Sequence, residues 1–264
     1  MRSTLTLLYG VVCYILFLVA FLYAIAFVAD LPVPRTVDGP VVGGRWALWI
    51  DLALLALFAV QHSGMARPGF KRWLTGWMSP ALERSTYVLL TSLALFLLYW
   101  QWRPLTGLVW DVGDGWARWL LYLLAAVGWL LVLTGTFVIN HFDLFGLRQV
   151  WLRARGRPYT ELQFKQQFYY RLIRHPLMLG FIVAFWAAPR MTVGHLLFAA
   201  VTTAYIVLAV KLLEERDLVA MHGEAYRRYQ REVPMLCPWP RPRARAGTPA
   251  APSTGAGPSA GSAV

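Results

Sequence analysis

Long apolar runs alternate with short polar segments along most of the chain. Each run is near the ~20 residues that an α-helix needs to cross a bilayer. The predicted membrane-spanning helices are Leu5 to Val28, Trp46 to Val60, Thr86 to Trp102, Trp119 to Ile139 and Thr192 to Leu213. The first run is longer than the apolar part of a signal peptide, and no small-residue cleavage site follows it before Asp30, so we expect it to be retained.

A shorter apolar stretch, Pro176 to Ala188, precedes the last span. A proline and an arginine separate the two, which predicts a tight helical hairpin whose first arm is short for a full crossing. After Lys211 the pattern predicts a polar amphipathic helix that ends at Val233 and Pro234. The sequence therefore predicts an all-α, polytopic integral membrane bundle of five to six segments, with a C-terminal helical hairpin and a cytosolic amphipathic helix.

Composition separates one predicted domain from a tail. We expect residues 1–240 to form a single membrane domain. From about Arg241 onward the chain is mostly Ala, Gly, Pro and Ser, which cannot bury a core. We expect residues 241–264 to be a disordered tail.

The amino-acid content excludes several classes of protein. Hydrophobic residues make up 58% of the chain and charged residues 14%, which is not the composition of a soluble enzyme. The net charge of +12 comes from basic residues placed between apolar runs, which indicates membrane topology rather than nucleic-acid binding. The two cysteines, Cys13 and Cys237, have no metal-ligand spacing, so we expect no metal site.

Basic residues also predict the orientation of the chain. Most of the 25 Lys and Arg residues fall in the loops 61–85 and 140–174 and in the C-terminal segment after Lys211. Cytoplasmic loops carry such an excess of positive charge. We therefore expect a bacterial-type inner membrane protein with both termini and the active site in the cytoplasm.

Two polar clusters flank the predicted hairpin. Arg174 and His175 precede Pro176, and Glu214 and Glu215 follow the last span. A hairpin would bring the clusters to the same interface, where free amides at the proline turn, with Arg174 and His175, form an anion pocket suited to a carboxylate. The glutamates could accept hydrogen bonds from hydroxyl or ammonium groups. The competing interpretation is that these are interfacial snorkelling charges at the start of a solvated helix.

This C-terminal pattern resembles the isoprenylcysteine carboxyl methyltransferase and phospholipid methyltransferase superfamily of integral membrane enzymes. The resemblance covers about the last 70 residues of the folded part, and Met178 stands where members usually carry an aromatic residue. It implies that residues 171–240 are the cofactor half and bind S-adenosylmethionine. The implied cofactor-binding residues are Arg174, His175, Pro176, Leu179, Gly180, Glu214, Glu215, Tyr226 and Tyr229.

The N-terminal part narrows the resemblance. The segments Gln61 to Arg67, Glu83 to Tyr87 and Asn140 to Gln149 are similar to those of the methanethiol S-methyltransferase branch. This resemblance covers nearly the whole chain to about Pro240. It implies that the substrate is a small thiol and the product dimethyl sulfide.

A thiol substrate needs help with ionisation, because a free thiol with a pKa of about 8.5 or higher is mostly protonated at pH 7. His141, oriented by Asp143, is the preferred base, provided that the chain leaves helical geometry by Phe142. The other candidate catalytic residues, which the predicted topology places at the same interface, are His62, Arg84 and Tyr87. For His62 and His141 the competing interpretation is a structural histidine at the level of the lipid headgroups.

Other functions stay open at this stage. One alternative within the superfamily is methylation of a larger lipidic or prenylated substrate. Another is a non-enzymatic transporter or haem-related membrane protein, with His62, His141 and His175 as axial ligands. No Cys-x-x-Cys-His motif supports haem, and the short fifth segment has no matching partner in the first half, as a transporter repeat would require.

Overall fold

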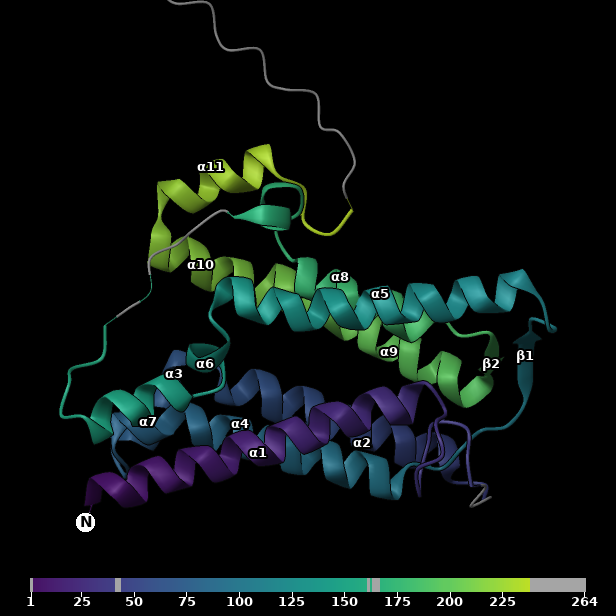
Figure 1. Cartoon of the computed structure of the whole chain (residues 1–264), viewed down its shortest axis with the longest axis horizontal. Coiled ribbons are helices and arrows are strands. Elements are labelled where there is room, and N and C mark those ends of the chain that lie inside the picture. Colours follow the sequence, from purple (N-terminus) through teal and green to yellow (C-terminus); the bar gives the residue numbers. More distant parts are fainter. Residues whose placement is uncertain (1, 41–43, 161, 163–166, 238–264) are drawn as a thin grey trace, which may run out of the picture.

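A computed structural model describes residues 2–40, 44–160, 162 and 167–237. The helices run along a common axis (Figure 1). They are α1 (Arg2–Val28), α2 (Ala47–Met65), α3 (Pro68–Thr75), α4 (Pro80–Gln101), α5 (Trp116–Ile139), α6 (His141–Leu144), α7 (Leu147–Ala154), α8 (Pro176–Trp186), α9 (Val193–Ala209), α10 (Glu215–His222) and α11 (Glu224–Glu232). Shorter elements are the 3-10 helix η1 (Phe168–Arg171), the π-helix η2 (Val210–Glu214) and the strands β1 (Leu108–Asp111) and β2 (Arg190–Thr192).

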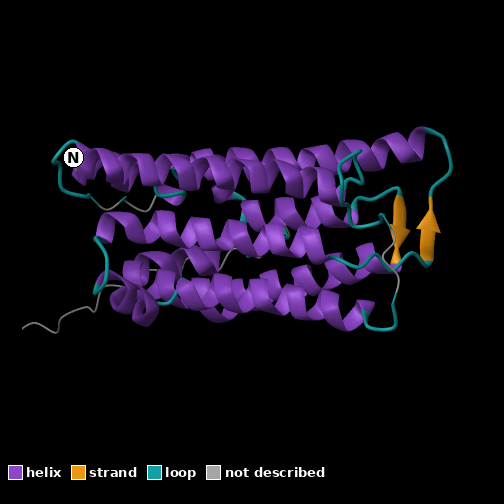
Figure 2. Cartoon of the chain, turned by 90° about the horizontal axis from the view of Figure 1, so that it is seen from below, coloured by secondary structure: helices purple, strands orange, loops and turns teal. Residues whose placement is uncertain are grey.

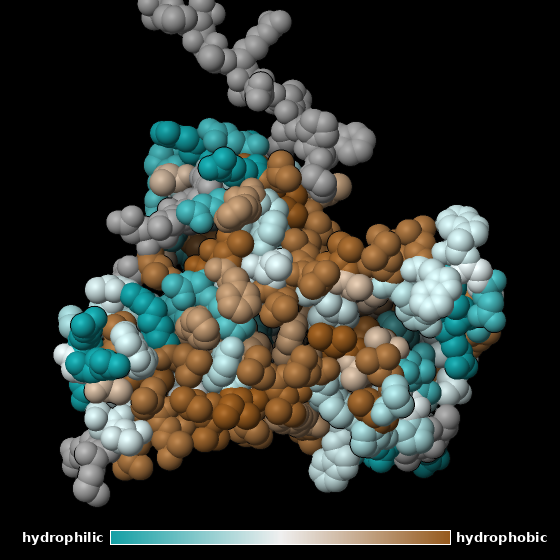
Figure 3. All heavy atoms as spheres, in the orientation of Figure 1, coloured by the Kyte–Doolittle hydropathy of each residue, from teal (hydrophilic) through white to brown (hydrophobic). Residues whose placement is uncertain are grey.

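The structure confirms the predicted class. Among the described residues, five helices are long and apolar enough to cross a membrane, and the last of them runs without interruption through α9, η2 and α10. The shorter α8 has 11 residues, as the interrupted apolar stretch predicted. Apolar atoms cover the middle of the bundle, and hydrophilic atoms gather toward its ends (Figure 3). The chain is an integral membrane protein.

The two ends of the bundle differ. At one end, called here the far end, β1 and β2 pair as a short antiparallel ribbon that the sequence analysis did not predict (Figure 2). The opposite end, called the site end, is where α2 ends and α8 begins. It also holds α3, α6, α7, α10 and α11, so the longest polar segments gather there (Figure 1).

Polar contacts close the far end. The Thr192 hydroxyl donates to Asp38 at 2.5 Å and also accepts the His195 amide that opens α9. The fully buried Asp51 of α2 accepts the backbone N–H of Arg103 at 2.9 Å. These bonds tie the connecting loops to the helices.

The helices form two layers that share one core. Helices α1, α2 and α4 pack together, and α5 packs along α8 in the other layer with α9 (Figure 1). Gly180 of α8 faces Gly128 of α5 so closely that a Cβ added at either residue would lie 2.7 Å from backbone atoms of the other helix. Large side chains from both layers, including Phe27, Trp129 and Phe198, fill the shared core.

The segment after the last span differs from the prediction in one respect. A single amphipathic helix to Val233 was expected, but the chain breaks at Gly223, whose φ of 58° is in the left-handed region that glycine tolerates best. The second piece, α11, turns back over the site end, where Tyr226, Tyr229 and Val233 form a small apolar cluster. The predicted tail 241–264 lies outside the described residues.

Candidate active site

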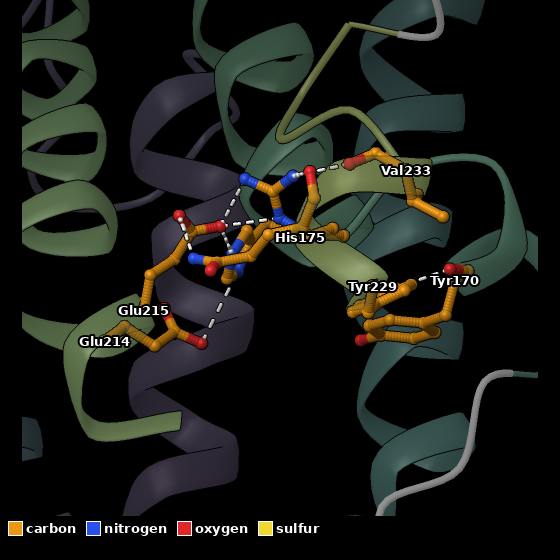
Figure 4. A network of polar contacts seen from close by, with 8 residues as sticks. Tyr170, His175, Glu214, Glu215, Tyr229 and Val233 are labelled. Atoms are coloured by element: carbon orange, nitrogen blue, oxygen red, sulfur yellow. Dashed lines mark hydrogen bonds and ion pairs between the residues drawn. The ribbon is translucent and has the colours of Figure 1, made fainter. Parts of the chain in front are cut away.

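A buried ionic network links the start of α8 to the start of α10. It consists of Arg174, His175 and Glu215, with the main-chain carbonyls of Gln230 and Val233, and is called here the Arg174 network (Figure 4). Arg174 Nε and Nη2 both lie 2.6 Å from Glu215 Oε1, and His175 Nε2 lies 3.2 Å from the same oxygen. The predicted meeting of the two polar clusters, about 40 residues apart in sequence, is therefore present in the structure.

Local chain geometry explains how these residues meet. Pro176 occupies the first turn of α8, where its missing N–H costs little. The backbone amides of Arg174 and His175 donate to the carbonyls of Pro234 and Met235, which the return of α11 brings to this position. The chain after α11 thus packs against the residues that precede α8.

The Arg174 network is almost fully satisfied. The side chains of Arg174, His175 and Glu215 are 6%, 4% and 11% exposed. Glu215 Oε2 also accepts a hydrogen bond from Gln230 Nε2 at 3.1 Å. Arg174 was expected to bind a ligand carboxylate. In the structure its guanidinium instead donates hydrogen bonds to Glu215 and to two main-chain carbonyls.

His175 carries a positive charge over a wide pH range. Burial opposes this charge, but hydrogen bonds to Glu214 and Glu215 and the charges of both carboxylates outweigh burial and raise the pKa of His175 to about 9. The ring lies between the two glutamates, with Nδ1 3.5 Å from Glu214 and Nε2 3.2 Å from Glu215.

The two adjacent glutamates differ in what they contact. Consecutive residues of a helix point about 100° apart, and the π-helix η2 ends at Glu214 just before α10 begins. Glu214 is 43% exposed, and its one close polar partner among the described residues is His175, whose Nδ1 lies 3.5 Å away. Its carboxylate therefore retains acceptor capacity for a ligand, whereas that of Glu215 is committed to the fold.

The remaining predicted cofactor residues lie around this network. Tyr229 donates to the carbonyl of Tyr170 at 2.5 Å (Figure 4), and Tyr226 packs edge-on against Tyr229. Leu179 lies half-buried one turn into α8. Gly180 is covered by α5, so its missing side chain serves helix packing in this structure. A shallow cleft of about 230 Å³ opens beside Glu215, lined also by Lys211, Arg216, Val219 and Gln230.

Three candidate catalytic residues gather at the ends of α2 and α4. The Tyr87 hydroxyl lies 3.0 Å from both ring nitrogens of His62. The Arg84 guanidinium sits 5.0 Å from the centre of the Tyr87 ring, and its Nε donates to the carbonyl of Leu144. The Arg67–Asp217 ion pair, at 3.1 Å, joins the end of α2 to α10, and the charges of Arg84 and Glu214 both act on His62.

His141 and Asp143 lie at the site end but are bonded to other residues. The chain leaves helical geometry at Asn140, whose φ is 145°, and His141 and Asp143 follow in the short helix α6. Tyr14 and Thr136 hold the two ring nitrogens of His141 at 2.7 and 2.8 Å. Burial lowers the pKa of His141.

Asp143 belongs to a separate ion pair. Its Oδ1 lies 2.8 Å from Arg148 Nη1, and its Oδ2 accepts from the Tyr159 hydroxyl at 3.2 Å. The expected orientation of His141 by Asp143 is therefore replaced by bonds that fix each side chain separately.

Sequence reasoning missed several partners of these residues. Tyr14, Thr136 and Tyr205 all lie within predicted spans, where they were counted only as part of apolar runs. A hydroxyl on a helix that crosses a membrane is itself a signal, because a buried hydroxyl needs a hydrogen-bond partner. The carbonyls of Gln230 and Val233 could not be anticipated from side-chain chemistry.

Comparison with known proteins places this chain in a family. The model for the NnrU protein family matches residues 52–235. Methanethiol S-methyltransferase of Mycobacterium tuberculosis is 57% identical over 91% of this chain and 98% of its own length. Methanethiol S-methyltransferase 1 of Bradyrhizobium diazoefficiens is 54% identical over 89% of this chain and 82% of its own length.

The chain belongs to the NnrU family, among the methanethiol S-methyltransferases. The chain is also similar, at lower identity, to Nurim of Rattus norvegicus, which is 34% identical over 68% of this chain and 71% of its own length. No solved structure matches the chain significantly. The NnrU match spans α2 to the segment after α11, and so contains both His62 and the Arg174 network. The predicted methyltransferase class is confirmed.

Proposed function

We propose that this protein transfers a methyl group from S-adenosylmethionine to methanethiol and releases dimethyl sulfide. The observation that carries the proposal is the similarity, over nearly the whole chain, to proteins named methanethiol S-methyltransferase. The grouping of histidine, arginine and glutamate side chains at one end of an apolar bundle supports it, because ionisable residues near membrane segments are costly and are usually retained for function.

Glu214 fits a role in holding the methyl donor. Its carboxylate is 43% exposed and has one long contact, so it can accept hydrogen bonds from ribose hydroxyls or an ammonium group. His175 lies beside it, with Nδ1 3.5 Å from Glu214 Oε1. The cofactor supplies a methyl group on a positively charged sulfonium, and a carboxylate nearby complements that charge.

The apolar surroundings favour this reaction. A thiolate is negative and the sulfonium is positive, so charge is neutralised as the methyl group moves, and the exclusion of water strengthens the attraction between them. The long apolar helices supply such surroundings close to the polar site end. Methanethiol offers few hydrogen bonds, so size and apolar contact would select it.

The site end is proposed to face the cytoplasm of a bacterial-type inner membrane. Helix α3 and the residues beside it carry Arg67, Lys71 and Arg72 at this end, and Arg148 and Arg174 lie there as well. Such a bias of positive charge marks the cytoplasmic side. Cytoplasmic S-adenosylmethionine would then reach the site directly.

The test uses the full chain in lipid nanodiscs. With methanethiol and a donor that carries a deuterated methyl group, dimethyl sulfide in the headspace should carry the label, and calorimetry should show that S-adenosylmethionine binds. Well-folded protein that binds no S-adenosylmethionine would contradict the proposal. Methylation of a prenylated cysteine or a lipid in place of methanethiol would show that the substrate is of the larger, lipidic class.

A further inference from the structure

Four ring-bearing side chains form a cluster between the two helix layers at the site end. They are Phe58 and His62 of α2, Tyr87 of α4 and Tyr205 of α9, and are called here the His62 cluster. The Phe58 ring stacks on His62 with centres 5.3 Å apart, and Tyr205 meets Phe58 edge-on at 6.3 Å. The Tyr205 hydroxyl is 2.9 Å from Ser63 Oγ, which ties α9 to α2.

His62 retains a ring nitrogen for another partner. The Tyr87 hydroxyl is 3.0 Å from both nitrogens and is their one hydrogen-bond partner among the described residues. A hydroxyl bonds well to one of the two at a time. His141 differs, because Tyr14 occupies one of its nitrogens and Thr136 the other.

Charges of both signs surround the His62 cluster. The positive charge of Arg84 and the negative charge of Glu214 both act on His62. Arg67 and Glu83 act on Tyr87, and Arg67 also acts on Tyr205. A positive guanidinium stabilises a forming thiolate, and a carboxylate complements a sulfonium. The two charges that the proposed reaction requires therefore both act on one imidazole.

We infer that His62 is the proton acceptor for the thiol and that the His62 cluster forms the thiol side of the active site. This inference rests on the proposed function. The S–H proton passes to the available His62 nitrogen, and an electron pair of the thiol sulfur forms the new S–CH₃ bond. The bond from methyl to sulfonium breaks, and its electron pair stays on the cofactor sulfur. The proton then leaves His62 for water, so one thiol and one sulfonium give two thioethers and one proton.

Within this assignment Tyr87 is a positioning residue. Its side chain is 7% exposed and held under Arg84, so its hydroxyl can fix the ring of His62 without itself meeting substrate. Phe58 is a specificity-determining residue, because its ring stacks on His62 and limits the space there, and Tyr205 meets Phe58 edge-on and holds it in place. A methyl group fits against an aromatic face, whereas a longer alkyl chain would collide with it.

The decisive experiment measures dimethyl sulfide formation against pH, from about pH 6 to 9.5, for nanodisc-embedded His62→Gln, Tyr87→Phe and His141→Gln. His62→Gln should lower the rate at pH 7 about 100-fold while S-adenosylmethionine affinity stays within about threefold. The deficit should shrink as pH rises, because more substrate arrives as thiolate. Tyr87→Phe should lose about tenfold with the same pH trend, and His141→Gln should lose less than His62→Gln.

His222→Gln is the matched control, because it removes a histidine of α10 that has no part in the proposal, and its rate should stay within about twofold. Phe58→Ala should raise activity on ethanethiol relative to methanethiol. A normal rate in His62→Gln, or a loss that high pH does not relieve, overturns the inference. If His62→Gln does not fold, Tyr87→Phe decides by the same pH criterion. Wild-type protein that makes no dimethyl sulfide overturns the proposed function instead.

Discussion

The Arg174 network and the His62 cluster lie at the same end of the bundle and both contain a buried histidine, but they use it differently. In the Arg174 network three charged side chains are at most 11% exposed and bonded to one another. In the His62 cluster the histidine has one hydroxyl partner among the described residues, and Glu214, a carboxylate whose charge acts on it, is 43% exposed. The first arrangement leaves no side-chain acceptor for a ligand, whereas the second leaves an acceptor nitrogen. Glu214, which contacts His175 and whose charge acts on His62, adds an acceptor carboxylate.

This difference separates structural from chemical roles. A buried ion pair contributes little net stability, but removal of one partner leaves an uncompensated charge. A polar group with spare hydrogen-bond capacity costs free energy unless a ligand or water uses it. Variants of the Arg174 network should therefore change stability first, and variants near the His62 cluster should change binding or rate first.

The largest effect is expected for Arg174→Ala. The change leaves Glu215 buried without its guanidinium partner and frees the carbonyls of Gln230 and Val233. The free energy of unfolding should fall by about 3 to 5 kcal/mol. Thermal unfolding in nanodiscs, followed by tryptophan fluorescence, measures this.

A double variant sharpens this test. Arg174→Met combined with Glu215→Met removes both charges and should recover a large part of the lost stability, because apolar pairs of similar volume often replace buried ion pairs. The exposed neighbour Arg216→Ala should unfold within about 0.5 kcal/mol of wild type. If Arg174→Ala is as stable as Arg216→Ala, the Arg174 network does not hold the fold.

The second effect is a dependence of stability on pH. The pKa of His175 is raised to about 9 in the folded chain, against about 6.5 for an ordinary histidine. The corresponding stabilisation, about 3 kcal/mol, is therefore complete below about pH 6.5 and is lost as pH rises through 9. The pKa of Tyr229, which burial raises to about 12, leaves that residue neutral in this range.

Unfolding temperature measured from about pH 6 to 10 should thus fall at the alkaline end. His175→Gln cannot titrate, and its curve should be flatter over the same range. Parallel curves for the two proteins would show that His175 is not charged in the fold.

The third effect concerns ligand affinity and contrasts two adjacent residues. Glu214→Gln should weaken S-adenosylmethionine binding about tenfold to a hundredfold, because a charge-assisted hydrogen bond contributes about 1.5 to 3 kcal/mol. Its unfolding temperature should fall less than that of Glu215→Gln, since Glu214 is 43% exposed and its contact with His175 is long. Glu215→Gln should lose stability as well as affinity. Equal effects of the two substitutions on unfolding would erase the distinction between these glutamates.

The sequence was sufficient to predict the five spans, the short α8 and the meeting of His175 with the glutamates. Membrane helices follow directly from the length of apolar runs, and the interruption at Pro189 gave the hairpin. The break at Gly223 and the β1–β2 ribbon were missed. Both depend on contacts between distant segments, and a single glycine in a polar helical pattern does not by itself specify a turn.

For the candidate site, the location of the side chains at one end of the bundle was predicted better than their pairings. His62, Arg84 and Tyr87 were grouped correctly at one end of the bundle, and the structure places them together. The preference for His141 with Asp143 came from their closeness in sequence, whereas Tyr14 and Arg148 take up their side chains. Which of two histidines keeps a ring nitrogen available depends on partners contributed by other helices, and no local pattern contains that information.

The smallest effect on stability is expected at the contact between the end of α2, which carries His62, and α10, which begins with Glu215. Arg67, just after α2, pairs with Asp217 of α10 at 3.1 Å, and the two side chains are 33% and 44% exposed. Exposed ion pairs contribute about 0 to 1 kcal/mol, so Arg67→Gln should shift the free energy of unfolding by no more than this. The pair nevertheless joins the helix of His62 to the helix that follows Glu214, and its loss would let the two separate. Methyl transfer should therefore fall by more than stability predicts, by about threefold to tenfold, and the loss should be similar in Asp217→Asn. The salt dependence of the wild-type rate provides a second measure, because screening weakens the same pair. If both variants match wild type in rate at low and high salt, the two regions keep their relative position without this contact, and the packing of Tyr205 against α2 is sufficient to hold them.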